Sequence, residues 1–183
     1  MTKKSPSTTD KPLKVLGITI RRPASVSAAA RGVPPPFNLS VEVENPADKP
    51  IYVWAKHRGF TYDAASRVLS VQLAEPAPNP NPKIKMLADH PRTPVQVMVG
   101  AKSRATIKIV LPPNVPRVVP SSQPNGAVDI VPEPIGPVDE VHIRVQYAAE
   151  QIKYRRGENP RDFKKRLLGH GDVVEATIKP TVE

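Results

Sequence analysis

Cysteine is absent from this chain of 183 residues, which excludes disulfide bonds, thiolate metal sites and cysteine nucleophiles. Aromatic residues make up only 4% of the sequence, and glycine occurs 9 times. The N-terminal region has one short apolar run, 15–20, too brief for a signal peptide or a membrane-spanning helix. We therefore expect no membrane partner, and a cytoplasmic or particle-associated location.

Signatures of catalysis and of metal binding are also missing. The four histidines, His57, His90, His142 and His170, lie far apart, and none has a partner at a recognised ligand spacing. No nucleophile elbow, phosphate-binding loop or dinucleotide-binding fingerprint occurs. We expect no enzyme activity, no catalytic or metal-binding residue, no cofactor and no small-molecule substrate.

Proline, in contrast, is abundant, with 24 residues. Because proline interrupts β-ladders, we predict long irregular connections at 75–94 and 112–138. The second is longer than ordinary linkage requires, so it is either functional or disordered. The dipeptide Asn125-Gly126 predicts a tight turn there, closing a small hairpin between 118–119 and 128–130.

Strict alternation of apolar and polar residues predicts the strands. The pattern is clearest in FNLSVEV at 37–43, where every second residue is apolar. The same period appears at 13–20, 51–55, 69–73, 95–99, 105–111, 141–147 and 172–179, with a bulge expected at Gly17. We predict an all-β fold: an antiparallel sandwich of seven or eight strands with long proline-rich loops.

One short helix is predicted before the last strand. Asn159 suits the N-cap, Pro160 the first helical position and Gly169 the end of the helix. Phe163 and Leu167 share a face. So short a helix is stable only when it is docked.

The net charge of +10 is concentrated in two segments. Residues 1–31 contribute +6 and residues 151–171 contribute +5, so the rest of the chain is nearly neutral. Clustered cations with an aromatic residue among them are typical of a surface that binds phosphate or an acidic partner. The candidate binding residues are Lys153, Tyr154, Arg155, Arg156, Arg161, Lys164, Lys165 and Arg166. The alternative is that these charges only keep a proline-rich chain soluble.

Two aromatic residues, Tyr52 and Trp54, alternate with inward-facing residues of the predicted strand 51–55. On the outer face of a sandwich they would be candidate interface anchors. The alternative is that a proline-rich loop or the helix covers them, which would make Trp54 part of the core.

Three segments resemble immunoglobulin-like β-sandwich modules: VEVENPADKPIYV (41–53), GAKSRATIKIVLP (100–112) and VHIRVQY (141–147). The resemblance is general to many adhesion, chaperone-like and assembly modules and points to no single family. The chain departs from antibody domains because it lacks both cysteines and carries a basic insertion at 148–171.

These observations predict a flexible basic tail at 1–12 and one sandwich domain at 13–183. The favoured function is a structural or adaptor subunit of a larger assembly, which binds a protein partner or further copies of itself through proline-rich arms and basic segments. The alternatives are a nucleic-acid-binding protein that uses 148–171 and the N-terminal arm, and an inhibitor or immunity-type protein. Sequence-specific readout is not expected, because no helix-turn-helix, zinc or RNA-binding signature occurs.

Overall fold

The computed structural model describes residues 12–21, 36–76, 92–120 and 128–183. The predicted tail at 1–12 lies outside these ranges except for residue 12, as does the turn at Asn125-Gly126. The described residues form twelve strands and one helix, so the all-β class is confirmed, and the strands outnumber the seven or eight predicted. The elements are β1 (Lys14–Arg21), β2 (Phe37–Asn45), β3 (Ile51–Trp54), β4 (Gly59–Asp63), β5 (Val68–Leu73), β6 (Gln96–Val99), β7 (Ser103–Leu111), β8 (Asn114–Pro120), β9 (Val128–Pro134), β10 (Glu140–Ala148), α1 (Pro160–Leu168), β11 (Asp172–Ile178) and β12 (Thr181–Val182).

The first sheet has four strands in the order β12-β1-β2-β7. β2 lies between antiparallel β1 and β7, and its four apolar residues in 37–43 are buried, as the alternation predicts. The register of β1 on β2 shifts between Val15 and Gly17, which confirms the bulge. The C-terminal β12 pairs with β1 in parallel.

The second sheet has six strands in the order β4-β5-β10-β3-β6, with β11 also paired to β10. β10 is antiparallel to β11 and parallel to β5, and its last residues, Tyr147 and Ala148, pair with β3. The parallel pairing differs from the antiparallel arrangement predicted throughout. It requires a long crossover, which the 66 residues between Leu73 and Glu140 supply.

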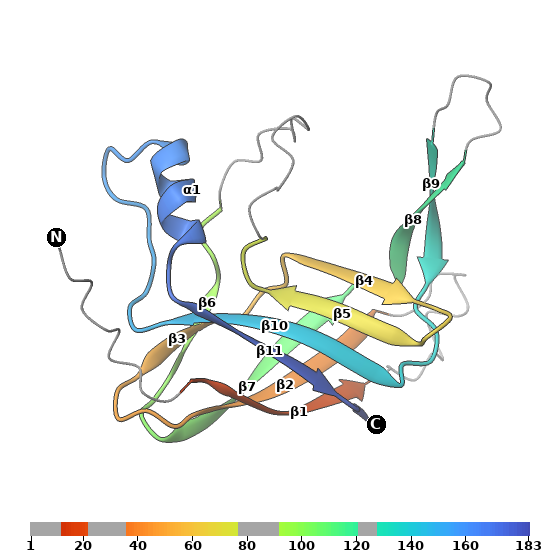
Figure 1. Ribbon diagram of the computed structural model, residues 1–183, viewed down its shortest axis with the longest axis horizontal. Coiled ribbons are helices and arrows are strands. Elements are labelled where there is room, and N and C mark those ends of the chain that lie inside the picture. Colours follow the sequence, from red (N-terminus) through yellow and green to blue (C-terminus); the bar gives the residue numbers. More distant parts are fainter. Residues whose placement is uncertain (1–11, 22–35, 77–91, 121–127) are drawn as a thin grey trace, which may run out of the picture.

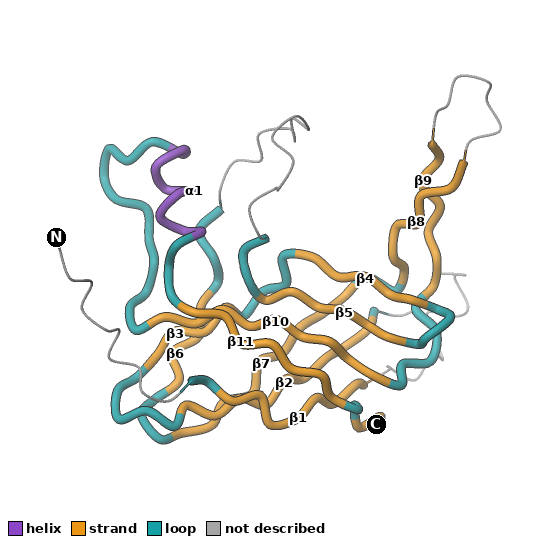
Figure 2. The backbone as a smooth tube through the Cα atoms, viewed as in Figure 1, coloured by secondary structure: helices purple, strands orange, loops and turns teal. Residues whose placement is uncertain are grey.

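The two sheets lie one over the other, and buried side chains from both form the core (Figure 1). Two segments project from the same side of this body, beyond the six-stranded sheet (Figures 1 and 2). One contains α1 and comprises residues 149–171, and we call it the basic lobe. The other is the hairpin of β8 and β9, which we call the β8–β9 arm.

The β8–β9 arm confirms the predicted hairpin. Val118 pairs with Ile130 and Val119 with Asp129, and the ladder extends to Asn114 and Pro134 at the base. Within the described ranges, no helix has the length and apolar character needed to span a membrane.

Candidate binding interface

The helix of the basic lobe begins and ends where its capping residues predict. The Oδ1 atom of Asn159 accepts a hydrogen bond from the backbone N–H of Asp162 at 2.9 Å. Pro160 occupies the first turn, and the N–H of Gly169 donates to the carbonyl of Lys165 at 3.3 Å. The helix is therefore fixed at both ends by local sequence.

The lobe is docked on the sheets through its apolar side chains. Phe163, Leu167 and Ile152 are buried and join the same cluster as the strands. Burial of each side chain stabilises the docked lobe by about 2 kcal/mol. The backbone N–H of Ile152 also donates to Oε1 of Gln96 on β6 at 3.0 Å. The lobe therefore presents its exposed groups from a defined position.

Two predicted binding residues are engaged inside the lobe. The Tyr154 ring stacks on Phe163, with centroids 3.8 Å apart. Arg166 donates from Nε to Oε1 of Glu158 at 2.9 Å and from Nη2 to Oε2 at 2.7 Å. Its Nη2 also donates to the carbonyl of Lys153 at 2.6 Å. These contacts join α1 to residues 153–158 of the same lobe.

The Arg166–Glu158 pair makes the lobe sensitive to acid. The hydrogen bonds from Arg166, helped by the N–H of Arg155, hold the pKa of Glu158 at about 2, below its ordinary 4.5. The folded state therefore binds this proton less readily than the unfolded state, so the pair stabilises the fold above pH 4.5 and loses this contribution as the pH falls toward 2. We expect urea unfolding to show wild type more stable than Glu158→Gln at pH 7, with the difference shrinking below pH 4.5.

The control for this prediction is Glu150→Gln. Glu150 is an exposed carboxylate of the same lobe that makes no ion pair with a described residue. Its replacement removes a carboxylate without breaking an ion pair, so the free energy of unfolding at pH 7 is expected to stay near that of wild type. If the difference in free energy of unfolding between wild type and Glu158→Gln stayed constant down to pH 2.5, the lowered pKa of Glu158 would be contradicted.

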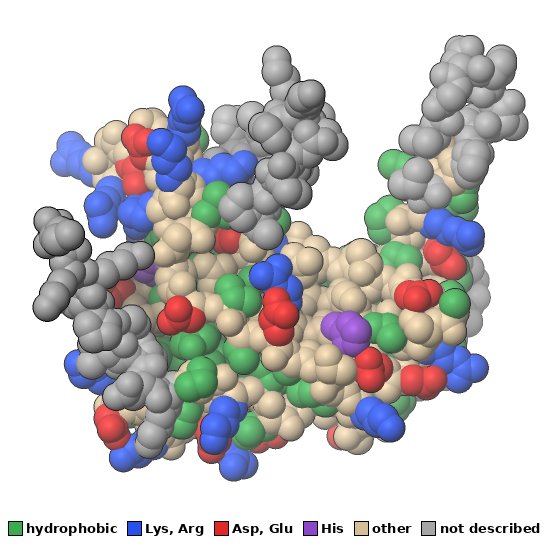
Figure 3. Space-filling model, viewed as in Figure 1, with side chains coloured by type: hydrophobic (Ala, Val, Ile, Leu, Met, Phe, Trp, Pro, Cys, Tyr) green, Lys and Arg blue, Asp and Glu red, His purple; other side chains and the backbone are tan. Residues whose placement is uncertain are grey.

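The remaining basic side chains of the lobe form an exposed cationic surface, visible as blue groups around α1 in Figure 3. All are exposed, and none is in an ion pair with a carboxylate of the described residues. These six are Lys153, Arg155, Arg156, Arg161, Lys164 and Lys165. Their charges are available to an external anion or acidic surface.

Of the two alternatives for Trp54, the structure contradicts the exposed interface anchor and agrees with the covered side chain. Its side chain is 0% exposed, and its indole N–H donates to Oε1 of Glu75 at 3.3 Å. The ring lies 6.0 Å from that of His170, at the end of the lobe. The lobe and the residues after β5 cover the outer face here, so Trp54 belongs to the core. Tyr52, two residues earlier, is half-buried.

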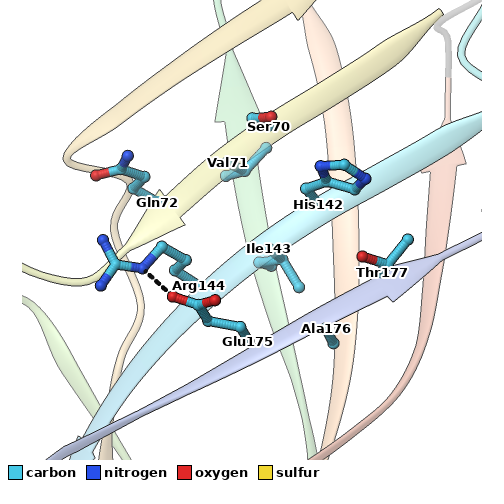
Figure 4. A pocket seen from close by; sticks show the side chains of 9 residues that line it. All are labelled: Ser70, Val71, Gln72, His142, Ile143, Arg144, Glu175, Ala176 and Thr177. Atoms are coloured by element: carbon cyan, nitrogen blue, oxygen red, sulfur yellow. Dashed lines mark ion pairs between the residues drawn. The ribbon is translucent and has the colours of Figure 1, made fainter. Parts of the chain in front are cut away.

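A shallow hollow of about 360 Å³ lies over β5, β10 and β11 (Figure 4). Nε of Arg144 and Oε1 of Glu175 form an ion pair across it at 2.8 Å. Nε2 of His142 lies 2.6 Å from Oε1 of Glu140, and His142 is paired with Ser70 on β5. No hydrogen bond joins the described residues Ser70 and His142.

Comparison with family models, curated proteins and solved structures finds no match to this chain. The local chemistry of the described residues must therefore indicate the function. In these ranges no group of three His, Asp or Glu side chains could hold a metal ion. The basic lobe and the β8–β9 arm are the candidate binding surfaces.

Sequence reasoning missed the exposed side chains of the β8–β9 arm. Ile130 is 69% exposed and Val131 is 45% exposed, although both are aliphatic and lie in a strand. The turn signal at Asn125-Gly126 located the hairpin. The many prolines of this segment could have indicated that the hairpin projects from the sheets. They reduce the number of N–H groups that the hairpin can offer to other strands.

Proposed function

We propose that the protein is a non-enzymatic structural or adaptor subunit of a larger assembly, built on an immunoglobulin-like β-sandwich. The observation that carries this proposal is the projection of the basic lobe and the β8–β9 arm from one side of the two-sheet body. Two separate elements on one side can engage one neighbour together, which supports a role in assembly.

The exposed aliphatic residues of the arm support contact with another protein. An isolated two-stranded hairpin is only marginally stable in water, because it has no second layer to bury its side chains. Ile130 and Val131 remain exposed in this way. A neighbouring protein would supply the missing layer, and burying one such side chain would contribute about 2 kcal/mol.

Nucleic-acid binding is the second candidate, and the six exposed cations of the lobe favour it. If all of them contacted phosphates, affinity would fall steeply with salt, by about a thousandfold between 50 and 200 mM. The stacking of Tyr154 on Phe163 weakens this candidate, because that face of the aromatic ring is occupied within the lobe.

One experiment separates these functions. We expect wild type to elute within a larger protein complex on size-exclusion chromatography of native extract. The variant with Arg155, Arg156, Lys164 and Lys165 changed to alanine should shift toward the free chain, because these exposed cations no longer contact the neighbour. Binding to labelled single- and double-stranded DNA and RNA is measured at 50 and 200 mM salt in parallel.

A charge-matched control changes four exposed lysines outside the lobe to alanine, and it should keep the larger complex. These are Lys49, Lys56, Lys108 and Lys179. Tight nucleic-acid binding that is steeply salt-dependent, lost in the lobe variant and kept in the control, would replace the assembly function with the second candidate. Elution of wild type as the free chain would contradict the assembly function directly.

A further inference from the structure

The register of the β8–β9 arm determines what its open edges can bind. Pro116 lies opposite Pro132, and Pro134 lies opposite Asn114. Antiparallel partners alternate between pairs that exchange two hydrogen bonds and pairs that exchange none. Proline has no N–H, so these are pairs without mutual hydrogen bonds. The backbone groups of these residues therefore point away from the hairpin, toward its open edges.

The prolines remove donors from both edges of the arm. On β8, Pro116 and Pro120 occupy outward-pointing positions, and on β9 Pro132 and Pro134 do the same. A further strand would need those missing N–H groups to complete a regular ladder. The arm is thereby protected against strand addition, so a partner must contact its side chains instead.

One side-chain face of the arm carries no charge. Side chains two residues apart share a face, which places Pro116, Ile130, Pro132 and Pro134 together. All four are exposed, and Ile130 is the most exposed of the large apolar side chains in the described ranges. The opposite face holds the charged groups, including the Arg117–Glu133 ion pair at 3.8 Å. The uncharged side therefore forms an apolar strip along the arm.

The charges on the arm disfavour nucleic acid as its occupant. Arg117 is its only described cation, and Asp129 and Glu133 give the described part of the arm a net charge of −1. Arms that lie along DNA require unpaired cations to contact phosphates. The uncharged face of the arm and its net charge of −1 together favour a protein as its binding partner.

The charges elsewhere disfavour a second copy of this chain. Nine of the fifteen carboxylates in the described ranges already pair with a lysine or an arginine of the same chain. A second copy would therefore offer few unpaired carboxylates to the six cations of the lobe, and its own net charge of +10 would repel the first copy. A different, acidic protein complements the lobe better.

We propose that the face formed by Pro116, Ile130, Pro132 and Pro134 docks side-on against an apolar patch of an acidic protein, and that the basic lobe contacts carboxylates of the same protein. This inference rests on the proposed function and names the class of partner. The arm supplies a contact that is insensitive to salt, and the lobe supplies one that salt weakens.

The absence of native cysteine makes position-specific crosslinking simple. Ile130→Cys on the arm, Lys164→Cys on the lobe and Lys108→Cys on β7 are each labelled with a benzophenone maleimide and irradiated in native extract. We expect positions 130 and 164 to crosslink to the same acidic protein and position 108 not to do so. That protein is then purified, and its affinity for the full chain is measured at 50 and 300 mM salt.

Ile130→Asp is expected to weaken this affinity at least tenfold at both salt concentrations, because it places a charge in an apolar contact. The double variant Lys164→Ala and Lys165→Ala should weaken affinity mainly at low salt. Val110→Asp, the same substitution at an exposed valine on β7, is the matched control and should bind as wild type. Thermal unfolding of each variant checks that the fold is intact.

The outcomes separate this inference from the proposed function. The inference alone is overturned if position 164 still captures a protein but position 130 does not crosslink to it. Position 130 would then crosslink to a second copy of this chain, to nucleic acid, or not at all. So does an Ile130→Asp variant that binds like Val110→Asp. If neither position crosslinks to any protein and wild type elutes as the free chain, the proposed function fails as well.

Discussion

Replacing Gly171 with alanine is expected to lower the free energy of unfolding by about 3 kcal/mol or more. Gly171 joins the basic lobe to β11 and has a φ of +78°, in the left-handed region. An added Cβ would lie 2.8 Å from the Cβ of Ala148 and would overlap the carbonyl oxygen of Tyr147. Both neighbours belong to β10, the central strand of its sheet, and cannot move aside cheaply.

Gly157→Ala provides the matched control. Gly157 also has a φ of +78°, but an added Cβ there meets nothing within 4 Å. Only the backbone strain remains, and we expect a loss of about 1 kcal/mol. Urea unfolding followed by fluorescence of Trp54, the one tryptophan of the chain, measures both variants. Equal losses would show that close packing of Gly171 on β10 is not the main cause.

Trp54→Ala is the second substitution with a large expected effect, a loss of about 3–5 kcal/mol. The side chain is fully buried, so its removal leaves a cavity that the surrounding strands fill only partly. Glu75 also loses its indole donor, although Arg58 still pairs with it at 2.8 Å. For a domain of this size the melting temperature should fall by about 10 °C.

The packing of His170 on Trp54 predicts where this loss appears first. Amide hydrogen exchange of α1 should accelerate more than exchange of β2, because the end of the lobe loses the ring against which it packs. Tyr52→Ala, at a half-buried position on the same strand, is the control and should cost less. A Trp54→Ala variant that melts like wild type would contradict the burial of this side chain.

Local sequence was sufficient to locate the elements that carry their own signal. The alternation at 37–43 identified β2, and Asn159 and Gly169 bracketed α1, because periodicity and capping act within a few residues. β4 and β12 carry no such signal. β4 has no buried residue, and β12 has only two residues, whose pairing with β1 depends on contacts across the whole chain.

Contacts between distant segments account for what sequence could not predict. The alternation at 51–55 places Trp54 on the outer face, but it carries no information about the lobe that covers that face. The cation cluster of the lobe was evident from sequence. The sequence did not reveal that Arg166 pairs with Glu158 inside the lobe. Glu158 lies in the loop before α1, and the path of this loop depends on how α1 is docked.

The arm shows the limit of a general rule about proline. Within the irregular segment 112–138, pairing was expected only between 118–119 and 128–130, yet β8 and β9 pair over seven residues each. The ladder survives because its prolines occupy positions whose N–H groups it does not use. Spacing, more than proline number, decides whether such a segment forms a hairpin.

The central position of β10 makes the second sheet depend on segments that lie far apart in the sequence. Leu69 of β5 pairs with Val141 of β10, and Val53 of β3 pairs with Tyr147 of β10. Thr19 of β1 pairs with Thr181 of β12. During synthesis, β3 and β5 therefore emerge long before β10, which joins them, and β1 lacks one neighbour until residues 181–182 are made. Topologies dominated by such distant pairings fold slowly. The nascent chain consequently exposes unpaired strand edges until β10 is made, and such edges are prone to aggregate.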